Sequence, residues 1–272
     1  MTVQTTIPLM QRTTGEALVE IGCRGGRAAL RRLRQAGSAK AILPHVGAMP
    51  EVVFLNTSGG LTAGDTLRYG LRIDAGVRAA GTTQTAERAY RADGVPAIVG
   101  VTLSVGEGGW LDWLPQETIL FDGCKLHRKT TITLAEGAGC LALEAVVLGR
   151  AAMGETVRRV QFRDQREIWR GTVPLAVEPV LLDDDALRAG PAGLGGARAF
   201  ASIMMVGALA GDGLDAVRMV LDEPGVEAAA SAFDGKLVVR MLAADGWPLR
   251  RQIVRALAVM RAGQPLPLVW QM

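Results

Sequence analysis

The sequence predicts a mainly β fold, in which stacked, helically wound β-sheets form a β-solenoid-like body and a small C-terminal α+β unit with two helices packs on it. Short stretches of alternating apolar and polar residues, typical of half-buried strands, fill most of the first 190 residues. Turns that contain glycine recur there about every 30 residues, as expected of coils that stack on one another. After residue 196 apolar residues also appear at helical spacing. An ordinary β-sandwich gives similar strand spacing and stays as the alternative.

The length and composition are those of a globular protein. A chain of 272 residues can bury a large core in one or two domains. We expect a layered β body over residues 1–190 and a β-α-β-β-α unit over residues 191–272, packed together as one continuous structural domain. Hydrophobic residues make up 49% of the chain but aromatic residues only 4%, so Val, Leu, Ile and Ala must form the core.

Charge and cysteine usage exclude several classes of partner. The 30 basic and 27 acidic residues are mixed along the chain, whereas nucleic-acid binding calls for a clustered basic face. No stretch of about 20 apolar residues and no signal-peptide pattern occurs, so we expect neither a membrane span nor export. The separated cysteines Cys23, Cys124 and Cys140 form no CxxC motif and indicate reduced thiols in a cytoplasmic protein.

Three short strands are predicted near the N-terminus, separated by turns in which glycine interrupts the apolar alternation. The strands cover residues 17–21, 28–33 and 39–43, and the turns fall at residues 24–26 and 35–37.

The next strand is predicted over residues 66–73, and the repeated turns follow it. The strand places apolar side chains on one face and Arg68 and Arg72 on the other. An apolar strand end, an acidic residue and a glycine then recur at Gly76, Gly108 and Gly137, about 30 residues apart, and each turn leads into a new strand.

Two further strands are predicted at residues 157–168 and 172–182. Pro174 and Pro179 cannot donate ladder hydrogen bonds, so they restrict the second strand to a sheet edge or a bulge. Residues 183–196, rich in glycine and aspartate, are predicted to form a loop that marks the boundary of the C-terminal unit.

The C-terminal unit combines strands and helices. A strand is predicted over residues 199–209 and a helix over residues 212–222. Asp234-Gly235 is a strong hairpin signal between two alternating stretches. Residues 247–261 form an amphipathic pattern with arginines on the polar face, which predicts the second helix.

The residue types of common catalytic and metal sites are scarce. His45 and His127 are the only histidines, too few for an ordinary triad or zinc site. Cys124 and His127 lie three positions apart, so on a strand they face opposite sides. Ser58 stands in no G-x-S-x-G motif, and short polar side chains that bond to local backbone explain its turn better. No glycine-rich segment has the G-K-[ST] ending of a phosphate loop.

The acidic residues are more informative. Several stand beside glycine turns or apolar strands instead of in exposed charge runs. Singly, each is best explained as a surface or turn-capping residue, but together they recur about once per predicted layer and would line a polar track. Carboxylates and water suit divalent cations that are held weakly, which passage requires. The candidate residues are Asp65, Glu87, Glu117, Asp122, Glu144 and Glu155.

Four ordered motifs resemble those of the urease accessory protein D family, which is called H in some organisms. The similarity spans nearly the whole chain, and the set of motifs is far more specific than any one of them. Ala63 stands where glycine is expected, and Leu268 stands where a basic residue is common. The motifs are NTSGGLTAGD at 56–65, TTQTAERAYR at 82–91, WLPQETILFDG at 113–123 and LGRAAMGE at 148–155, with the ending PLPLVW at 265–270.

This resemblance implies a non-catalytic chaperone for urease maturation. Members of the family link apo-urease to accessory proteins F and G, of which G is a GTPase, and nickel passes through this complex to the urease active site. The family fold is a body of stacked, helically wound sheets with two helices. The resemblance implies no catalytic residue, no stably bound cofactor and no stable metal site. The recurring acids and the scarcity of His and Cys lead us to expect that nickel in transit passes the six acidic candidates.

Two other functions remain open from the residues alone. A stacked β body with spaced carboxylates is compatible with a carbohydrate-active enzyme that uses two acids, although aromatic platforms for sugar rings are few. A structural scaffold without an ion route is the second alternative.

Overall fold

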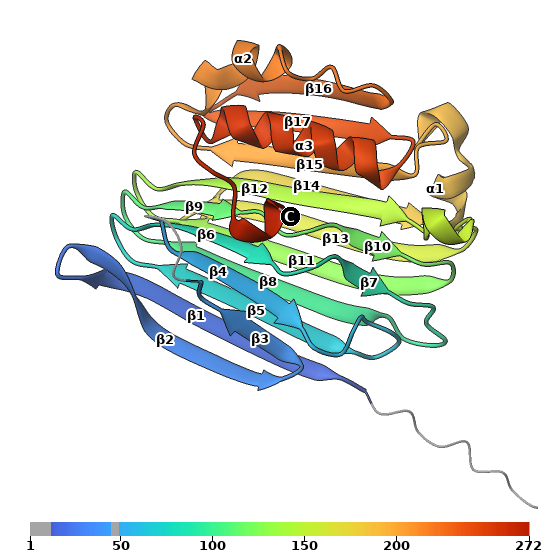
Figure 1. Cartoon of the computed structure of the whole chain (residues 1–272), viewed down its shortest axis with the longest axis horizontal. Coiled ribbons are helices and arrows are strands. Elements are labelled where there is room, and N and C mark those ends of the chain that lie inside the picture. Colours follow the sequence, from blue (N-terminus) through green and yellow to red (C-terminus); the bar gives the residue numbers. More distant parts are fainter. Residues whose placement is uncertain (1–11, 45–48, 272) are drawn as a thin grey trace, which may run out of the picture.

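The computed structural model describes residues 12–44 and 49–271, which form two stacked β-sheets with helices beside the second one (Figure 1). The first sheet has seven strands in the order β14-β13-β11-β8-β5-β1-β2. The second has ten strands, mainly in the order β16-β17-β15-β12-β9-β6-β4-β3, and β10 pairs with both β12 and β7. Predictions on His45 lie outside the described residues.

The strand bounds are as follows. The first sheet contains β1 (Thr14–Arg24), β2 (Arg27–Gly37), β5 (Thr66–Ile73), β8 (Ala97–Val105), β11 (Cys124–Leu134), β13 (Val160–Arg170) and β14 (Val173–Asp183). The second contains β3 (Ala39–Ile42), β4 (Glu51–Asn56), β6 (Arg78–Thr83), β7 (Glu87–Ala89), β9 (Trp110–Trp113), β10 (Thr118–Leu120), β12 (Gly139–Leu148), β15 (Ala199–Val206), β16 (Val226–Phe233) and β17 (Lys236–Ala243).

The chain winds between the sheets as stacked coils, which confirms the predicted β-solenoid-like body. From β5 to β12 it alternates between the sheets, and each strand pairs in parallel with its equivalent in the next coil. The repeated turns also stack: the Gly76 N–H donates to the Glu107 carbonyl at 2.8 Å, and the Gly108 N–H donates to the Glu136 carbonyl at 3.0 Å. The three glycines adopt positive φ angles, which explains their recurrence.

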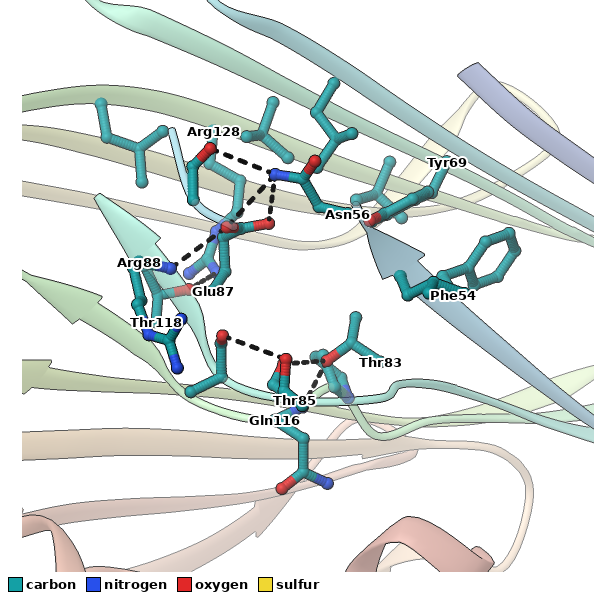
Figure 2. Close-up of a pocket in the computed structure, with 18 of the residues that line it drawn as sticks. Phe54, Asn56, Tyr69, Thr83, Thr85, Glu87, Arg88, Gln116, Thr118 and Arg128 are labelled. Carbon is teal, nitrogen blue, oxygen red and sulfur yellow. Dashed lines mark hydrogen bonds between the residues drawn. The ribbon is translucent and has the colours of Figure 1, made fainter. Parts of the chain in front are cut away.

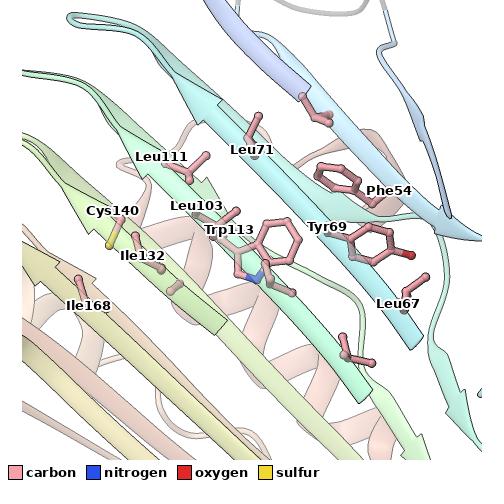
Figure 3. Close-up of a cluster of buried hydrophobic side chains, with 14 of the residues drawn as sticks. Phe54, Leu67, Tyr69, Leu71, Leu103, Leu111, Trp113, Ile132, Cys140 and Ile168 are labelled. Carbon is pink, nitrogen blue, oxygen red and sulfur yellow. The ribbon is translucent and has the colours of Figure 1, made fainter. Parts of the chain in front are cut away.

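The main hydrophobic core fills the space between the two sheets (Figure 3). Strand β5 contributes through the alternation that its sequence predicts, with its apolar residues buried and its arginines exposed. Three aromatic residues meet here: the ring of Phe54 lies 4.8 Å from that of Tyr69 and 6.0 Å from that of Trp113, measured between centroids. Most of the remaining core residues are aliphatic, as the composition predicts.

The two prolines of β14 act as predicted. Strand β14 is an edge of the first sheet, and its pairing with β13 shifts register between Ile168 and Trp169. Pro174 and Pro179 lie in β14, so neither removes a hydrogen bond from the middle of the sheet.

The C-terminal strands extend the second sheet. Strand β15 pairs antiparallel with β12, and the hairpin of β16 and β17 continues beyond it. The hairpin turn is the predicted one, with φ angles of 47° at Asp234 and 70° at Gly235. Helix α3 (Gly246–Met260) confirms the second predicted helix and buries Ile253 and Leu257 in a second core on the outer side of this sheet. The division of the chain at residue 190 stays a prediction.

Two details of the helix prediction were wrong. Residues 183–196 contain a short helix, α1 (Asp184–Arg188), because the Asp183 carboxylate accepts the Ala186 N–H at 2.9 Å and caps it. The helix predicted at 212–222 is shorter than expected: it is α2 (Leu214–Arg218), which follows a 3₁₀ turn (Ala210–Gly213). The described chain therefore has three α-helices, of which none is long and apolar enough to cross a membrane.

Candidate functional site

A polar cavity of ≈ 80 Å³ lies between the two sheets, at the end of β4 and β6 (Figure 2). Strands β5, β8 and β11 contribute an apolar floor, and loops that follow β4, β6 and β9 form the rim. This volume has room for several water molecules, because one water needs roughly 10–15 Å³. The polar residues that line it are Asn56, Thr83, Thr85, Glu87, Arg88, Gln116, Thr118, Arg128 and Glu144.

Glu87 stands at the rim of the cavity, where β7 begins. Its carboxylate accepts the side-chain N–H of Asn56 at 3.3 Å and the backbone N–H of Arg88 at 3.1 Å (Figure 2). Burial raises the pKa of Glu87 to about 7, and the negative charge of Asp65 adds to the shift. Near neutral pH this carboxyl group therefore exchanges readily between its charged and neutral forms.

Glu144 lies on the opposite wall, in a buried ionic cluster. Arg128 forms a bidentate pair with Asp164, at 2.9 and 2.8 Å, and its Nη1 lies 2.8 Å from Glu144 Oε2 and donates to Thr118 Oγ1 at 2.9 Å. One guanidinium therefore faces two buried carboxylates. Burial raises the pKa of Glu144, and Asp164 adds to the increase while Arg128 opposes it. Arg166 also opposes the increase, and it is itself paired with Glu178, so the positive and negative charges of this region are closely balanced.

Glu144 also borders a second, open groove of ≈ 540 Å³ between β13–β14 and β15–β17. The base of this groove continues the line of charges: Arg166 bonds to Glu178, and Arg240 Nη2 lies 3.0 Å from Glu178 Oε1. Polar side chains thus follow one another from the rim at Glu87, past Arg128, to the groove.

One buried N–H group at the cavity wall, Gln116 Nε2, has no protein acceptor within residues 12–44 and 49–271. The other side-chain atom of Gln116, Oε1, accepts Arg250 Nη1 at 2.6 Å, which fixes the orientation of the amide. Buried donors of this kind require water or a polar guest.

The other candidate acids lie outside this cavity. Asp65 is buried and accepts the backbone N–H groups of Thr13 at 2.7 Å and Thr62 at 2.8 Å. It therefore ties the turn before β5 to the start of the chain. Glu117 is partly exposed and lies 3.6 Å from Arg250.

Asp122 and Glu155 organise a pair of neighbouring turns. Asp122 accepts the backbone N–H groups of Arg158 at 2.7 Å and Arg159 at 2.9 Å, and these bonds lower its pKa. Because they hold the chain in place, β13 begins at residue 160 and not at residue 157. Glu155 accepts Arg150 Nε at 2.7 Å and the Asp122 N–H at 3.2 Å, and its pKa is likewise lowered.

Arg128 and Asp164, which complete the cluster, were not among the site residues predicted from the sequence. A signal for Asp164 was present. Strand β13 alternates, and residues 160, 162, 164, 166 and 168 share its buried face, so an acid at 164 stands among core residues. The pairing with Arg128 depends on the register of β11 and β13, where the two residues lie directly opposite.

The Ser58 turn and the Cys124–His127 pair have the local geometry that the sequence predicts. Ser58 Oγ donates to Asn56 Oδ1 at 2.6 Å, and the Ser58 N–H bonds to the same oxygen, so the serine builds its turn. Cys124 and His127 lie on β11 and face opposite sides, with Cys124 buried. No group of three or more His, Cys, Asp or Glu side chains in the described parts of the chain is placed to hold a metal ion.

Comparison with known proteins identifies the family. The model of the UreD urease accessory protein family matches residues 13–271. The urease accessory protein UreD of Cereibacter sphaeroides (strain ATCC 17025 / ATH 2.4.3) is 61% identical over 265 residues, which cover 96% of each chain. That of Paracoccus denitrificans (strain Pd 1222) is 53% identical over 96% of this chain and 93% of its own. The chain belongs to the UreD urease accessory protein family.

Proposed function

We propose that this protein is a non-catalytic, cytoplasmic chaperone of urease maturation. It links apo-urease to accessory proteins F and G, and it provides a passage for nickel on the way to the urease active site. Its membership of a family of urease accessory proteins supports the role in urease maturation. The passage is supported by geometry, because the acids of the interior lie on connected polar surfaces.

The main support for the proposed passage is the position of Glu144. Its carboxylate borders both the internal cavity and the open groove, so the same side chain contacts both spaces. Glu87 stands at the other side of the cavity, near the rim. Two carboxylates thus mark the ends of a short polar route between the sheets, with Arg128 beside it.

The chemistry of the route suits a divalent cation in transit. Carboxylate, amide and water oxygens bind borderline cations such as nickel weakly enough for release. Glu87 and Glu144 supply carboxylate oxygens from the cavity wall. Because Glu87 has a pKa of about 7, it loses its proton at little cost when a cation arrives and regains it on departure.

The carbohydrate-active alternative receives less support from this site. The cavity of ≈ 80 Å³ is well below the roughly 300 Å³ of ordinary small-molecule pockets. In the groove, Asp164 and Glu178 are bonded to arginines, which hinders a role as general acid or nucleophile.

Conservative variants test the proposal. Asp65 and Asp122 hold the backbone, so their removal would confuse folding with transfer; Glu87→Gln and Glu144→Gln change charge with little change of shape. Urease activation by purified apo-urease, accessory proteins, nickel and GTP is measured with each variant. Complex assembly is checked separately by size-exclusion chromatography. The control is Glu136→Gln, an exposed acid in a turn between coils.

We expect both single variants to assemble normally and to activate urease several-fold more slowly, while Glu136→Gln behaves as the wild type. Normal activation by both variants in intact complexes would contradict the passage and favour a scaffold without an ion route.

A further inference from the structure

Strand β2 is an unusually exposed sheet edge. All of its residues except Ala29 are exposed, and Ala29 is only half-buried. One side pairs with β1, and β2 ends the strand order of the first sheet. Figure 1 shows β2 as the outermost strand, at the end of the molecule far from α2 and β16. Its free side presents backbone N–H and C=O groups that another strand can pair with.

The two edges of the first sheet differ in chemistry. Edge strand β14 contains Pro174 and Pro179, and a proline cannot donate a hydrogen bond to an added strand. Strand β2 contains no proline over its 11 residues. Prolines thus hinder the addition of a strand at β14, whereas β2 can pair with another strand along its length.

The side chains of β2 show what kind of strand it accepts. It carries four arginines and no acidic residue: Arg27, Arg31, Arg32 and Arg34. The pairs that three of them form are on the surface, with distances of 3.1 to 3.8 Å and arginine side chains 56–64% exposed, so much of their charge stays available. Leu30 and Leu33 lie opposite the core residues Ile21 and Val19 of β1, yet they are 47% and 38% exposed.

The charges on β2 distinguish between the strands that could pair with this edge. A second copy of the chain paired along β2 would place arginines against arginines, and like charges on adjacent strands destabilise a sheet. Residues 1–11 of the chain contain no acidic residue. An acidic segment of another protein would meet opposite charges and would also cover Leu30 and Leu33.

We propose that β2 is a docking edge for an extended, acidic segment of a protein partner, which adds to the first sheet as an eighth strand. This inference rests on the proposed function, because the partner is sought among apo-urease and the accessory proteins. Backbone pairing gives the affinity, and the arginines select an acidic strand.

Hydrogen exchange tests the docking edge directly. Exchange is measured by mass spectrometry on the purified chain alone and in the assembled complex with apo-urease and accessory proteins F and G. We expect peptides from Arg27–Gly37 to gain protection in the complex. Peptides from β14, the edge with two prolines, serve as the internal control and should change less.

Charge reversal provides the second measurement. Arg27→Glu with Arg32→Glu should weaken assembly about tenfold at low salt, whereas the same two positions changed to Lys should bind nearly as the wild type does. The matched control is Arg68→Glu with Arg163→Glu, two exposed arginines on other strands of the same sheet. Thermal unfolding confirms that every variant is folded.

The outcomes separate the two proposals. A complex that forms without new protection of β2, or that tolerates the reversal as well as the control does, contradicts the docking edge alone. Protection of β2 in the chain alone at high concentration would identify a second copy as the occupant and overturn the proposal. A wild-type chain that binds neither apo-urease nor the accessory proteins contradicts the proposed function together with the docking edge.

Discussion

The carboxylates that face the cavity between the sheets and those in the surface turns are of the same residue types, but their surroundings shift their pKa values in opposite directions. Asp122 and Glu155 accept backbone or arginine N–H groups at the surface, and these bonds lower their pKa values. Glu87 and Glu144 face a cavity, where burial raises their pKa values. A carboxylate whose lone pairs are filled by N–H donors holds the chain together, whereas one with a raised pKa and polar space beside it is able to receive a cation.

The largest expected effect comes from Arg128, on which the interior acids depend. Arg128→Met leaves Glu144 and Asp164 buried without their shared cation, and removing one partner of a buried ion pair costs roughly 3 to 5 kcal/mol. Urea unfolding should show a loss of this size. A loss below about 1 kcal/mol would mean that the interior acids do not carry charge in the folded protein.

The next largest effect is a pH dependence of folding stability that comes from Glu87. Its folded pKa of about 7 lies above its ordinary value of 4.5, so the folded state binds the proton more tightly. Stability contributed in this way is present at low pH and is lost as the pH rises through 7. Glu87→Gln removes the titration, so the stability of the variant relative to the wild type should increase by about 2 to 3 kcal/mol between pH 5 and pH 8. Urea unfolding of both proteins at pH 5 and pH 8 measures this change. If the difference in unfolding free energy between variant and wild type is the same at the two pH values, the pKa of Glu87 is not raised.

The stability contributed by Asp122, an acid of the turns, should depend on pH in the direction opposite to that of Glu87. The pKa of Asp122 is lowered by the backbone N–H groups of Arg158 and Arg159, so its stabilisation is present at neutral pH and disappears as the pH falls through its folded pKa. Asp122→Asn weakens those bonds and should cost about 1 to 2 kcal/mol at pH 7. Wild type and variant should converge in acid. If they diverge there instead, Asp122 behaves as an interior acid.

The smallest effect is expected at Glu117. Its pair with Arg250 is 3.6 Å long and partly exposed, and such pairs contribute about 0 to 1 kcal/mol. Glu117→Gln should therefore leave the unfolding midpoint and urease activation almost unchanged. A clear loss of urease activation with normal stability would mean that Glu117 acts in nickel passage together with Glu87 and Glu144.

The sequence was sufficient for features that local chemistry determines. The glycine turns at Gly76, Gly108 and Gly137, the proline-limited edge and the Asp234-Gly235 hairpin all follow from backbone preferences of a few residues. Helix α1 was missed because its cap, Asp183, stands in a stretch that also reads as a loop.

The roles of the acids required the register of distant strands. Asp122 meets its donors 36 and 37 residues away, and Asp164 meets Arg128 across 36 residues. An acid beside a turn therefore looks the same in sequence whether its oxygens meet backbone N–H groups or a cavity. The recurrence of acids along the coils therefore did not indicate which way each carboxylate points.

The central claim is that nickel passes the interior acids and not the turn acids. Two double variants compare them directly: Glu87→Gln with Glu144→Gln, and Asp122→Asn with Glu155→Gln. The measurement is nickel bound per urease active site after activation with equal amounts of purified, intact accessory complex. We predict a several-fold loss of nickel with the interior pair and near-normal loading with the turn pair. Equal loading by both, or a loss confined to the turn pair, would contradict the claim.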